Sequence, residues 1–226
     1  DVSRRLLDLG LGYLSLDRAA STLSTGERQR VQLARAVRNR TTGVLYVLDE
    51  PSIGLHPYNL QGLTGVMDDL VADGNSVVLV DHDIQVLSHA DWLIELGPGA
   101  GSDGGRVIDQ GTVPQVAGSS SSVIGPFLRK QLAGGDHLIG GQSSRLREWI
   151  ADDHLFDLGT ITLATDTIHT VRPLKVSIPQ GRLTVVTGVS GSGKTTLILE
   201  SLIPALMTKI SKQKSPRHVV SLQAEG

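Results

Sequence analysis

The eight residues GVSGSGKT at 188–195 constrain the fold of this chain more than any other stretch. They match the pattern G-x-x-x-x-G-K-[ST] in full, follow the apolar run LTVVT and precede the helix-like segment TTLILESLIPALM. Glycines at 188, 191 and 193 allow backbone N–H groups to turn toward phosphate oxygens, and the start of a helix adds partial positive charge. The alternative is a glycine-rich turn without a ligand. The full match in this context favours a phosphate-binding loop in an α/β fold.

The loop predicts ATP and Mg²⁺ as ligands. Lys194 is expected to lie on the β- and γ-phosphates, and the Thr195 hydroxyl is expected to ligate Mg²⁺. The other residues expected to contact the nucleotide here are Gly188, Ser190, Gly191, Ser192, Gly193 and Thr196.

A second candidate site is the stretch VLYVLDEP at 44–51. Its continuous apolar run is typical of a central parallel strand that is covered on both faces. The carboxyl ends of such strands line the ligand crevice, which would place Asp49 to hold Mg²⁺, directly or through water. Glu50 would then polarise the attacking water as a general base. The alternative is a strand that ends in an acidic turn.

Two further features are compatible with a phosphate site. In LSTGERQR, Ser24 or Thr25 is a plausible N-cap, and a helix that starts at Ser24–Gly26 directs N–H groups toward an anion such as a γ-phosphate. An ordinary capped helix with a solvated basic face explains the same residues. His82 follows the apolar run SVVLV, where an imidazole would reach the γ-phosphate or serve only as a polar loop residue.

Helix and strand patterns alternate along the chain. Helices are expected before Gly10 and at 23–37, 60–72 and 195–207; strands are expected at 44–48, 76–80, 91–97, 106–111, 174–181, 183–188 and 218–222, with one or two more in 155–171. This order predicts an α/β fold of P-loop NTPase type, with a parallel central sheet flanked by helices and a small antiparallel part. Clusters of Gly and Ser predict a linker at 117–150.

Composition excludes several classes of protein. The chain has no Cys, so it has neither disulfides nor CxxC zinc modules. Its net charge of −2 gives no overall nucleic-acid footprint, and no run of 18 apolar residues predicts a membrane span. The first residues, DVSRRLLDLG, contain neither an initiator Met nor a signal-peptide core, which suggests a fragment or processed chain. A cytoplasmic protein fits these features.

Together these motifs resemble an ATP-binding-cassette (ABC) ATPase. LSTGE resembles the signature, LYVLDE the Walker B strand, SIGLH the D-loop and His82 the switch histidine. More narrowly, VLYVLDEPSIGLH, ADWLIELGPGAGSDGG and LTVVTGVSGSGKTTL are similar to the UvrA family, which belongs to the bacterial excinuclease system. The resemblance covers about residues 5–115 and 172–207.

The resemblance implies a division of the chain, because UvrA proteins carry two cassettes in one polypeptide. Residues 1–116 look like the C-terminal half of the first cassette, 117–150 like a linker, and 151–226 like the N-terminal part of the second. ABC sites are composite, so the loop Gly188–Thr195 would pair with the signature residues of the other cassette. Here those residues are Ser24, Thr25, Gly26 and Glu27. Asp49, Glu50 and His82 would then serve the other ATP, and the isolated chain would lack a complete hydrolytic site.

The same resemblance implies an ATPase that couples ATP to DNA damage recognition in nucleotide excision repair. It implies DNA, a UvrB-like protein and a second copy as partners, and no membrane. Zinc is expected in the family, but its CxxC ligands are absent from this chain. Thr25 replaces the usual Gly of the signature, which hints at a UvrA-like paralogue. The alternatives are a transporter-type or drug-resistance ATPase, against which the order of the motifs argues, and a nucleotide-binding remnant without turnover.

Overall fold

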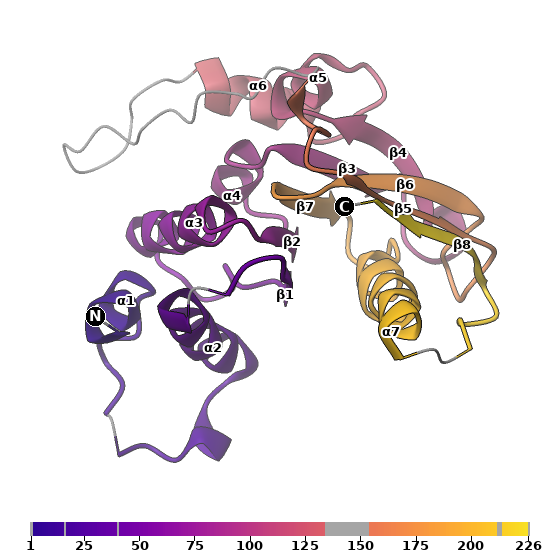
Figure 1. Ribbon diagram of the computed structural model, residues 1–226. Helices are drawn as coiled ribbons and strands as arrows, with labels where there is room; N and C mark the ends of the chain where they lie inside the picture. The colour runs from indigo at the N-terminus through magenta and orange to yellow at the C-terminus, as the bar shows by residue number, and fades with distance from the viewer. Residues whose placement is uncertain (1, 16, 40, 134–153, 212–213, 226) are drawn as a thin grey trace.

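A computed structural model describes residues 2–15, 17–39, 41–133, 154–211 and 214–225 (Figure 1). The α-helices are α1 Val2–Asp8, α2 Thr25–Asn39, α3 Pro57–Ala72, α4 Ile84–Ser88, α5 Val113–Gly118, α6 Gly125–Ala133 and α7 Ile203–Ser211. The strands are β1 Leu45–Asp49, β2 Ser76–Val80, β3 Trp92–Gly97, β4 Arg106–Gly111, β5 Thr160–Thr165, β6 Leu174–Pro179, β7 Leu183–Gly188 and β8 Val219–Ala224.

The central sheet has the strand order β1-β2-β7-β3-β4. The first four of these strands run parallel, and β4 pairs antiparallel with β3 at the edge. The runs Val77–Val80 and Leu183–Val186 are fully buried, as expected of parallel strands that are covered on both faces. The prediction of a parallel central sheet flanked by helices is confirmed.

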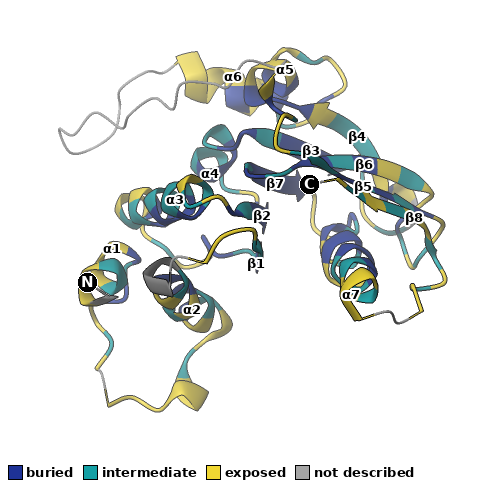
Figure 2. Ribbon diagram, viewed as in Figure 1, coloured by how far each residue is buried: buried dark blue, intermediate teal, exposed yellow. Residues whose placement is uncertain are grey.

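Two layers cover the central sheet. On one face Val77 and Leu79 pack with the helices α1 to α6, whereas on the other face Val78 and Val80 pack with the smaller sheet and the helix after the phosphate loop. This division follows from the alternation of side chains along a strand. Figure 2 shows the buried positions concentrated in β2, β7 and β3 and on the inner sides of α3 and α7.

The smaller sheet is antiparallel, with the order β6-β5-β8, and confirms the predicted antiparallel part. In β5, Ile161, Leu163 and Thr165 are buried and alternate with half-buried residues. The region 155–171 holds one named strand. Its first residues instead form a turn in which Phe156 packs edge-on against Trp92, with ring centroids 5.2 Å apart.

The linker prediction at 117–150 needs correction over its first part. Helices α5 and α6 occupy most of 117–133, and Leu128 is fully buried. The buried carboxylate of Glu95 on β3 accepts hydrogen bonds from Ser122 Oγ at 2.6 Å and from the backbone N–H groups of Val123 and Ile124, each at 3.1 Å. Serines that composition assigns to a flexible segment here satisfy a buried charge. Residues 134–150 lie outside the described residues.

The two segments that the resemblance assigns to different cassettes, 1–116 and 151–226, share the central sheet. Strand β7, from segment 151–226, lies between β2 and β3, which belong to segment 1–116. Both segments therefore contribute to one sheet and one pair of cores in this chain. Their assignment to two different cassettes stays a prediction. Across the described residues, none of the helices combines the length and hydrophobicity needed to span a bilayer.

Candidate nucleotide site

The phosphate-binding loop starts where β7 ends, at Gly188, and leads into a π-helix over Thr196–Leu202 that continues as α7. The loop glycines have φ values of +135° at Gly188, +76° at Gly191 and +95° at Gly193. Only glycine adopts these values without strain. A Cβ at Gly188 would also overlap the carbonyl oxygen of Leu96. The structure thus explains the glycine spacing of the motif.

Lys194, near the end of the loop, is 8% exposed. Its Nζ donates to the carbonyl oxygens of Gly188 at 2.9 Å and Val189 at 3.0 Å. Burial lowers the pKa of Lys194, and the negative charges of Glu50 and Asp49 oppose this shift. The ammonium group therefore contacts the loop carbonyls and lies in the field of the Asp49 and Glu50 carboxylates.

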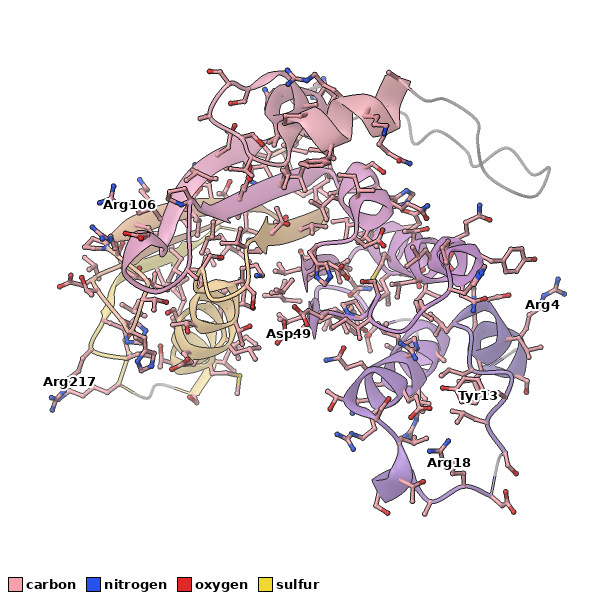
Figure 3. The ribbon with its side chains drawn as sticks, turned by 180° about the vertical axis from the view of Figure 1, so that it is seen from behind. Arg4, Tyr13, Arg18, Asp49, Arg106 and Arg217 are labelled. Carbon is pink, nitrogen blue, oxygen red and sulfur yellow. The ribbon has the colours of Figure 1, made fainter. Side chains whose placement is uncertain are left out.

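Asp49 at the end of β1 lies beside the phosphate-binding loop. Burial raises the pKa of Asp49, as does the neighbouring Glu50, whereas the nearby Lys194 ammonium and Thr195 hydroxyl lower it. Figure 3 shows Asp49 at the boundary between the β1 region and the segment that carries the loop.

This arrangement differs from the expectation that Asp49, Glu50 and His82 serve another ATP than the loop does. The sheet order β1-β2-β7 puts one strand between Asp49 and the loop, and β1, β2 and β7 run parallel. Their carboxyl ends therefore meet at one edge, which is where α/β sheets bind ligands. Within this chain the carboxylates at the end of β1 and the phosphate-binding loop therefore lie at the same edge of the sheet.

Glu50 and His82 complete this edge. Glu50 has a φ of +50°, an uncommon value for a residue other than glycine, and its N–H donates to Val80 O at 2.7 Å. Its Oε1 lies 3.9 Å from His82 Nδ1, and the side chains are 40% and 61% exposed. A strained backbone with an accessible carboxylate beside an imidazole suits a proton acceptor.

Sequence reasoning missed Asp81, which is fully buried next to His82. Its Oδ1 accepts from Ser52 Oγ at 2.7 Å and from the N–H groups of His82 and Asp83 at 2.7 and 3.0 Å. Its Oδ2 accepts from Ser52 N–H at 3.3 Å. Asp81 therefore joins the D-loop to the histidine segment. The signal available in the sequence is an acidic residue directly after a continuous apolar strand, because a buried carboxylate needs several donors.

Arg30 on α2 is a second missed residue. It is 4% exposed, and its Nη1 lies 3.3 Å from Pro51 O and 3.4 Å from Ile53 O. The guanidinium group thereby connects the signature helix to the D-loop. A solvated basic face was the simple interpretation of this helix, and it does not hold for Arg30.

The signature residues form a capping box at the start of α2. Ser24 Oγ accepts from Glu27 N–H at 3.2 Å, and Glu27 Oε2 accepts from Ser24 N–H at 2.6 Å. Tyr13 also donates to Glu27, at 2.5 Å, and this hydrogen bond and the one from Ser24 lower the pKa of Glu27 to about 2.

In Figures 1 and 3, α2 and the helix after the phosphate loop lie on opposite sides of β1. The structure therefore does not bring Ser24, Thr25, Gly26 and Glu27 to the loop of the same chain. Their contact with the loop of another cassette or copy stays a prediction.

The residues at this edge fit Mg²⁺ by their chemistry. The Asp49 carboxylate and the Thr195 hydroxyl are adjacent oxygen donors, which Mg²⁺ prefers, and Asp49 carries a cost of burial that a cation would offset. Among the described residues no group of three or more His, Cys, Asp or Glu side chains is placed to hold a metal ion. The chain has no Cys for the zinc sites expected in the family.

The loop, the carboxylates at the end of β1 and the histidine after β2 define a P-loop fold of the ABC class. No family model matches the chain. Three proteins named UvrABC system protein A are similar to it: 44% identical over 201 residues in Chlamydia trachomatis, 41% over 213 in Thermus thermophilus and 43% over 210 in Deinococcus radiodurans. These matches cover 89%, 93% and 93% of this chain.

The chain spans only 10%, 21% and 19% of the length of these three relatives. The crystal structure of UvrA2 from Deinococcus radiodurans is similar to 98% of this chain and 25% of that one, with 37% identity and a TM-score of 0.52. The chain belongs to the UvrA family, as a match to one segment of those proteins.

Proposed function

We propose that this chain is part of an ATP-binding and ATP-hydrolysing protein that resembles UvrA and couples ATP to recognition of damaged DNA in nucleotide excision repair. The observation that carries the proposal is the convergence of Asp49, Lys194 and Thr195 at one sheet edge. A strand, a glycine loop and a helix supply phosphate donors there, and a second strand supplies the carboxylates.

Each residue has a role in this proposal. The backbone N–H groups of Ser190, Gly191 and Gly193, the Lys194 ammonium and the Thr196 hydroxyl bind the phosphate oxygens. Asp49 and Thr195 would hold Mg²⁺, which when bound neutralises charge on the β- and γ-phosphates. The remaining donors come from a signature segment equivalent to Ser24–Glu27 in a second cassette or copy.

Hydrolysis uses the residues that follow β1 and β2. A water attacks the γ-phosphorus, the bond to the bridging oxygen breaks, and ADP carries the electron pair away. The Glu50 carboxylate accepts the proton of the water, and His82, 3.9 Å away, holds the transferred phosphate in place. The exposure of both side chains leaves them accessible to substrate.

Two substitutions test nucleotide chemistry at this site. Lys194→Ala is expected to abolish measurable binding of a fluorescent ATP analogue, with Lys209→Ala in the last turn of α7 as the control. Glu50→Gln in the whole parent protein is expected to retain ATP binding and lose turnover, with the exposed Glu225→Gln as the control. Unchanged affinity in Lys194→Ala would remove the loop from the proposal, and turnover retained by Glu50→Gln would remove the general base. Binding without turnover in the unmodified parent protein would indicate the non-hydrolysing remnant.

The partners proposed for the parent protein are DNA, a UvrB-like protein and a second copy, in the cytoplasm. The relatives found by comparison do not favour a transporter or drug-resistance ATPase. Stimulation of ATP turnover by damaged DNA in the parent protein is the expected result. Turnover that is indifferent to DNA would contradict the repair function and leave the ATPase assignment intact.

A further inference from the structure

A second glycine-rich loop, Pro98–Gly105 between β3 and β4, lies against the phosphate-binding loop. The N–H of Gly101 lies 3.4 Å from the carbonyl oxygen of Gly191, and the N–H of Gly105 donates to the carbonyl oxygen of Ser192 at 3.1 Å. Two carbonyl groups of the phosphate-binding loop are thus engaged from outside by backbone donors of Pro98–Gly105.

The contact between Gly105 and Ser192 also fixes the direction of the Gly193 N–H group. The carbonyl of Ser192 and the N–H of Gly193 belong to one planar trans peptide unit, in which the two groups point in opposite directions. Holding the Ser192 carbonyl against Gly105 therefore directs the Gly193 N–H away from Pro98–Gly105. The N–H of Ser192 itself donates within the loop, to Val189 O at 3.2 Å. Gly193 is thus the residue whose donor this contact orients toward phosphate.

The packing around the contact leaves no room for side chains. Gly104 is buried, and a Cβ there would lie 2.5 Å from Gly99 O and 3.3 Å from Ser192 Cα. Gly105 has a φ of +74°, and a Cβ there would overlap the carbonyl oxygen of Thr170.

Both backbone polar groups of Gly105 form hydrogen bonds. Its N–H holds the phosphate-binding loop, and its carbonyl oxygen accepts from Arg172 N–H at 2.8 Å. The turn before β6 reaches the same loop directly, because a Cβ at Gly193 would lie 2.5 Å from Val171 Cγ2. The phosphate-binding loop is therefore enclosed between Pro98–Gly105 and the turn that ends at Arg172.

We propose that Pro98–Gly105 is a positioning loop for nucleotide binding, with Gly105 as its central residue. It sets the orientation of the Ser192–Gly193 peptide before phosphate arrives, so that less ordering is needed on binding. This inference rests on the proposed function of the GVSGSGKT segment as a nucleotide site.

Glycine-to-alanine substitutions test the proposal. A Cβ at Gly105 would overlap Thr170 O, and a Cβ at Gly104 would lie 2.5 Å from Gly99 O, whereas Gly74→Ala carries a comparable positive φ of +81° and would meet no atom within 4 Å. Gly74 lies between α3 and β2, outside Pro98–Gly105, so Gly74→Ala is a control for backbone strain alone. Binding of a fluorescent ATP analogue is measured on the full chain with Mg²⁺, and folding is followed by circular dichroism.

We expect the Kd of Gly105→Ala and Gly104→Ala to rise about tenfold or more, which corresponds to about one lost charge-assisted hydrogen bond. Gly74→Ala is expected to stay within about twofold of the unmodified chain. If Gly105→Ala does not fold, Gly104→Ala decides the outcome. A folded Gly104→Ala or Gly105→Ala variant with unchanged affinity would overturn the proposal.

The backbone amide NMR signals of Gly191–Gly193 give a readout that does not depend on nucleotide. We expect these signals to shift in Gly104→Ala and Gly105→Ala and to keep their positions in Gly74→Ala. If the unmodified chain binds no nucleotide, the proposed role of GVSGSGKT as a nucleotide site is wrong. The amide signals alone then test whether Gly105 orients the Ser192–Gly193 peptide. Unchanged signals in the clashing variants would then overturn the positioning role.

Discussion

The buried carboxylate of Asp81 provides a quantitative test of the link between the D-loop and the histidine segment. It accepts two hydrogen bonds from Ser52 and one each from the N–H groups of His82 and Asp83. Asp81→Ala leaves three backbone N–H groups without their acceptor. At about 1 kcal/mol or more for each unsatisfied donor, the expected loss of stability is about 3 kcal/mol or more.

Two milder changes separate the individual bonds. Asp81→Asn keeps one acceptor oxygen and turns an NH₂ group toward Ser52 N–H, which we expect to cost about 1–3 kcal/mol. Ser52→Ala removes the 2.7 Å bond to Oδ1 and is expected to cost a similar amount. The double variant Ser52→Ala/Asp81→Asn is expected to cost less than the sum, because both single changes disturb the same pair of residues.

The assay is urea unfolding of the full chain followed by circular dichroism, with the free energy of unfolding compared at constant slope. The reasoning fails if the two single changes add to within about 0.5 kcal/mol, since residues in one hydrogen-bonded network are expected to couple by more than that. It also fails if Asp81→Ala costs no more than Asp81→Asn.

Three further predictions concern other contacts of the same chain. Arg30→Met is expected to destabilise the fold by about 1–3 kcal/mol through loss of its bonds to the D-loop carbonyls, whereas the exposed Arg35→Met on the same helix leaves the urea midpoint unchanged. Leu63→Ala, at a fully buried position of α3, is expected to cost about 2–5 kcal/mol in the same assay. The pKa of Glu27, about 2 against an ordinary 4.5, makes its stabilising contribution complete above pH 4.5 and lost as the pH falls toward 2. The difference in Tm between the unmodified chain and Glu27→Gln should therefore shrink over that interval, and a constant difference would contradict this assignment.

Much of the fold was predictable because its signals are local. Continuous apolar runs at 44–48, 76–80 and 183–188 predict parallel strands, and each is a strand of the central sheet. The runs in β2 and β7 are buried, but the prediction of a central, covered strand at 44–48 is wrong, because β1 is an edge strand in which only Leu48 is buried. The helix predicted at 195–207 is present, but it begins as a π-helix over Thr196–Leu202 and extends to Ser211. Hydrophobic periodicity does not report that local change of hydrogen bonding.

The order of the strands was not predictable from local patterns. Ser76 Oγ accepts a hydrogen bond from Gly181 N–H, 105 residues further along the chain. Nothing in either segment alone specifies that β7 enters between β2 and β3. Family resemblance assigns the loop and the strand of Asp49 to different cassettes, and that assignment stays a prediction.

In the candidate site, too, local patterns predict the motif residues but not the residues whose partners lie far away in the sequence. Lys194 and Thr195 are read from a motif, whereas the roles of Asp81 and Arg30 depend on partners 29 and 21 residues away. Glu95 offered an indirect signal, because a carboxylate inside the apolar run WLIELG requires buried donors. Its donors lie in a Gly/Ser-rich segment that composition alone assigns to a linker.

The pairing of β2 with β7 has a direct test, because the chain contains no Cys that would interfere with an engineered disulfide. The register places Val77 opposite Leu183, so Ser76 and Arg182 are the next pair at the open end of the two strands. Neighbouring strands lie about 4.8 Å apart, which is within the Cα separation of about 4.4–6.8 Å that a disulfide bridges. Ser76→Cys/Arg182→Cys is therefore expected to form an intrachain disulfide under mild oxidation.

The matched control is Ser76→Cys/Lys175→Cys, since Lys175 lies on β6 in the other sheet at nearly the same distance along the chain. Non-reducing electrophoresis and mass spectrometry at two protein concentrations distinguish bonds within one chain from bonds between chains. A disulfide that forms only between chains would mean that β7 pairs with β2 of a second copy, as two separate cassette fragments would allow. The single site built from Asp49, Lys194 and Thr195 would then belong to a dimer, and the order of the motifs along the chain would reflect two cassettes that meet only in the assembly.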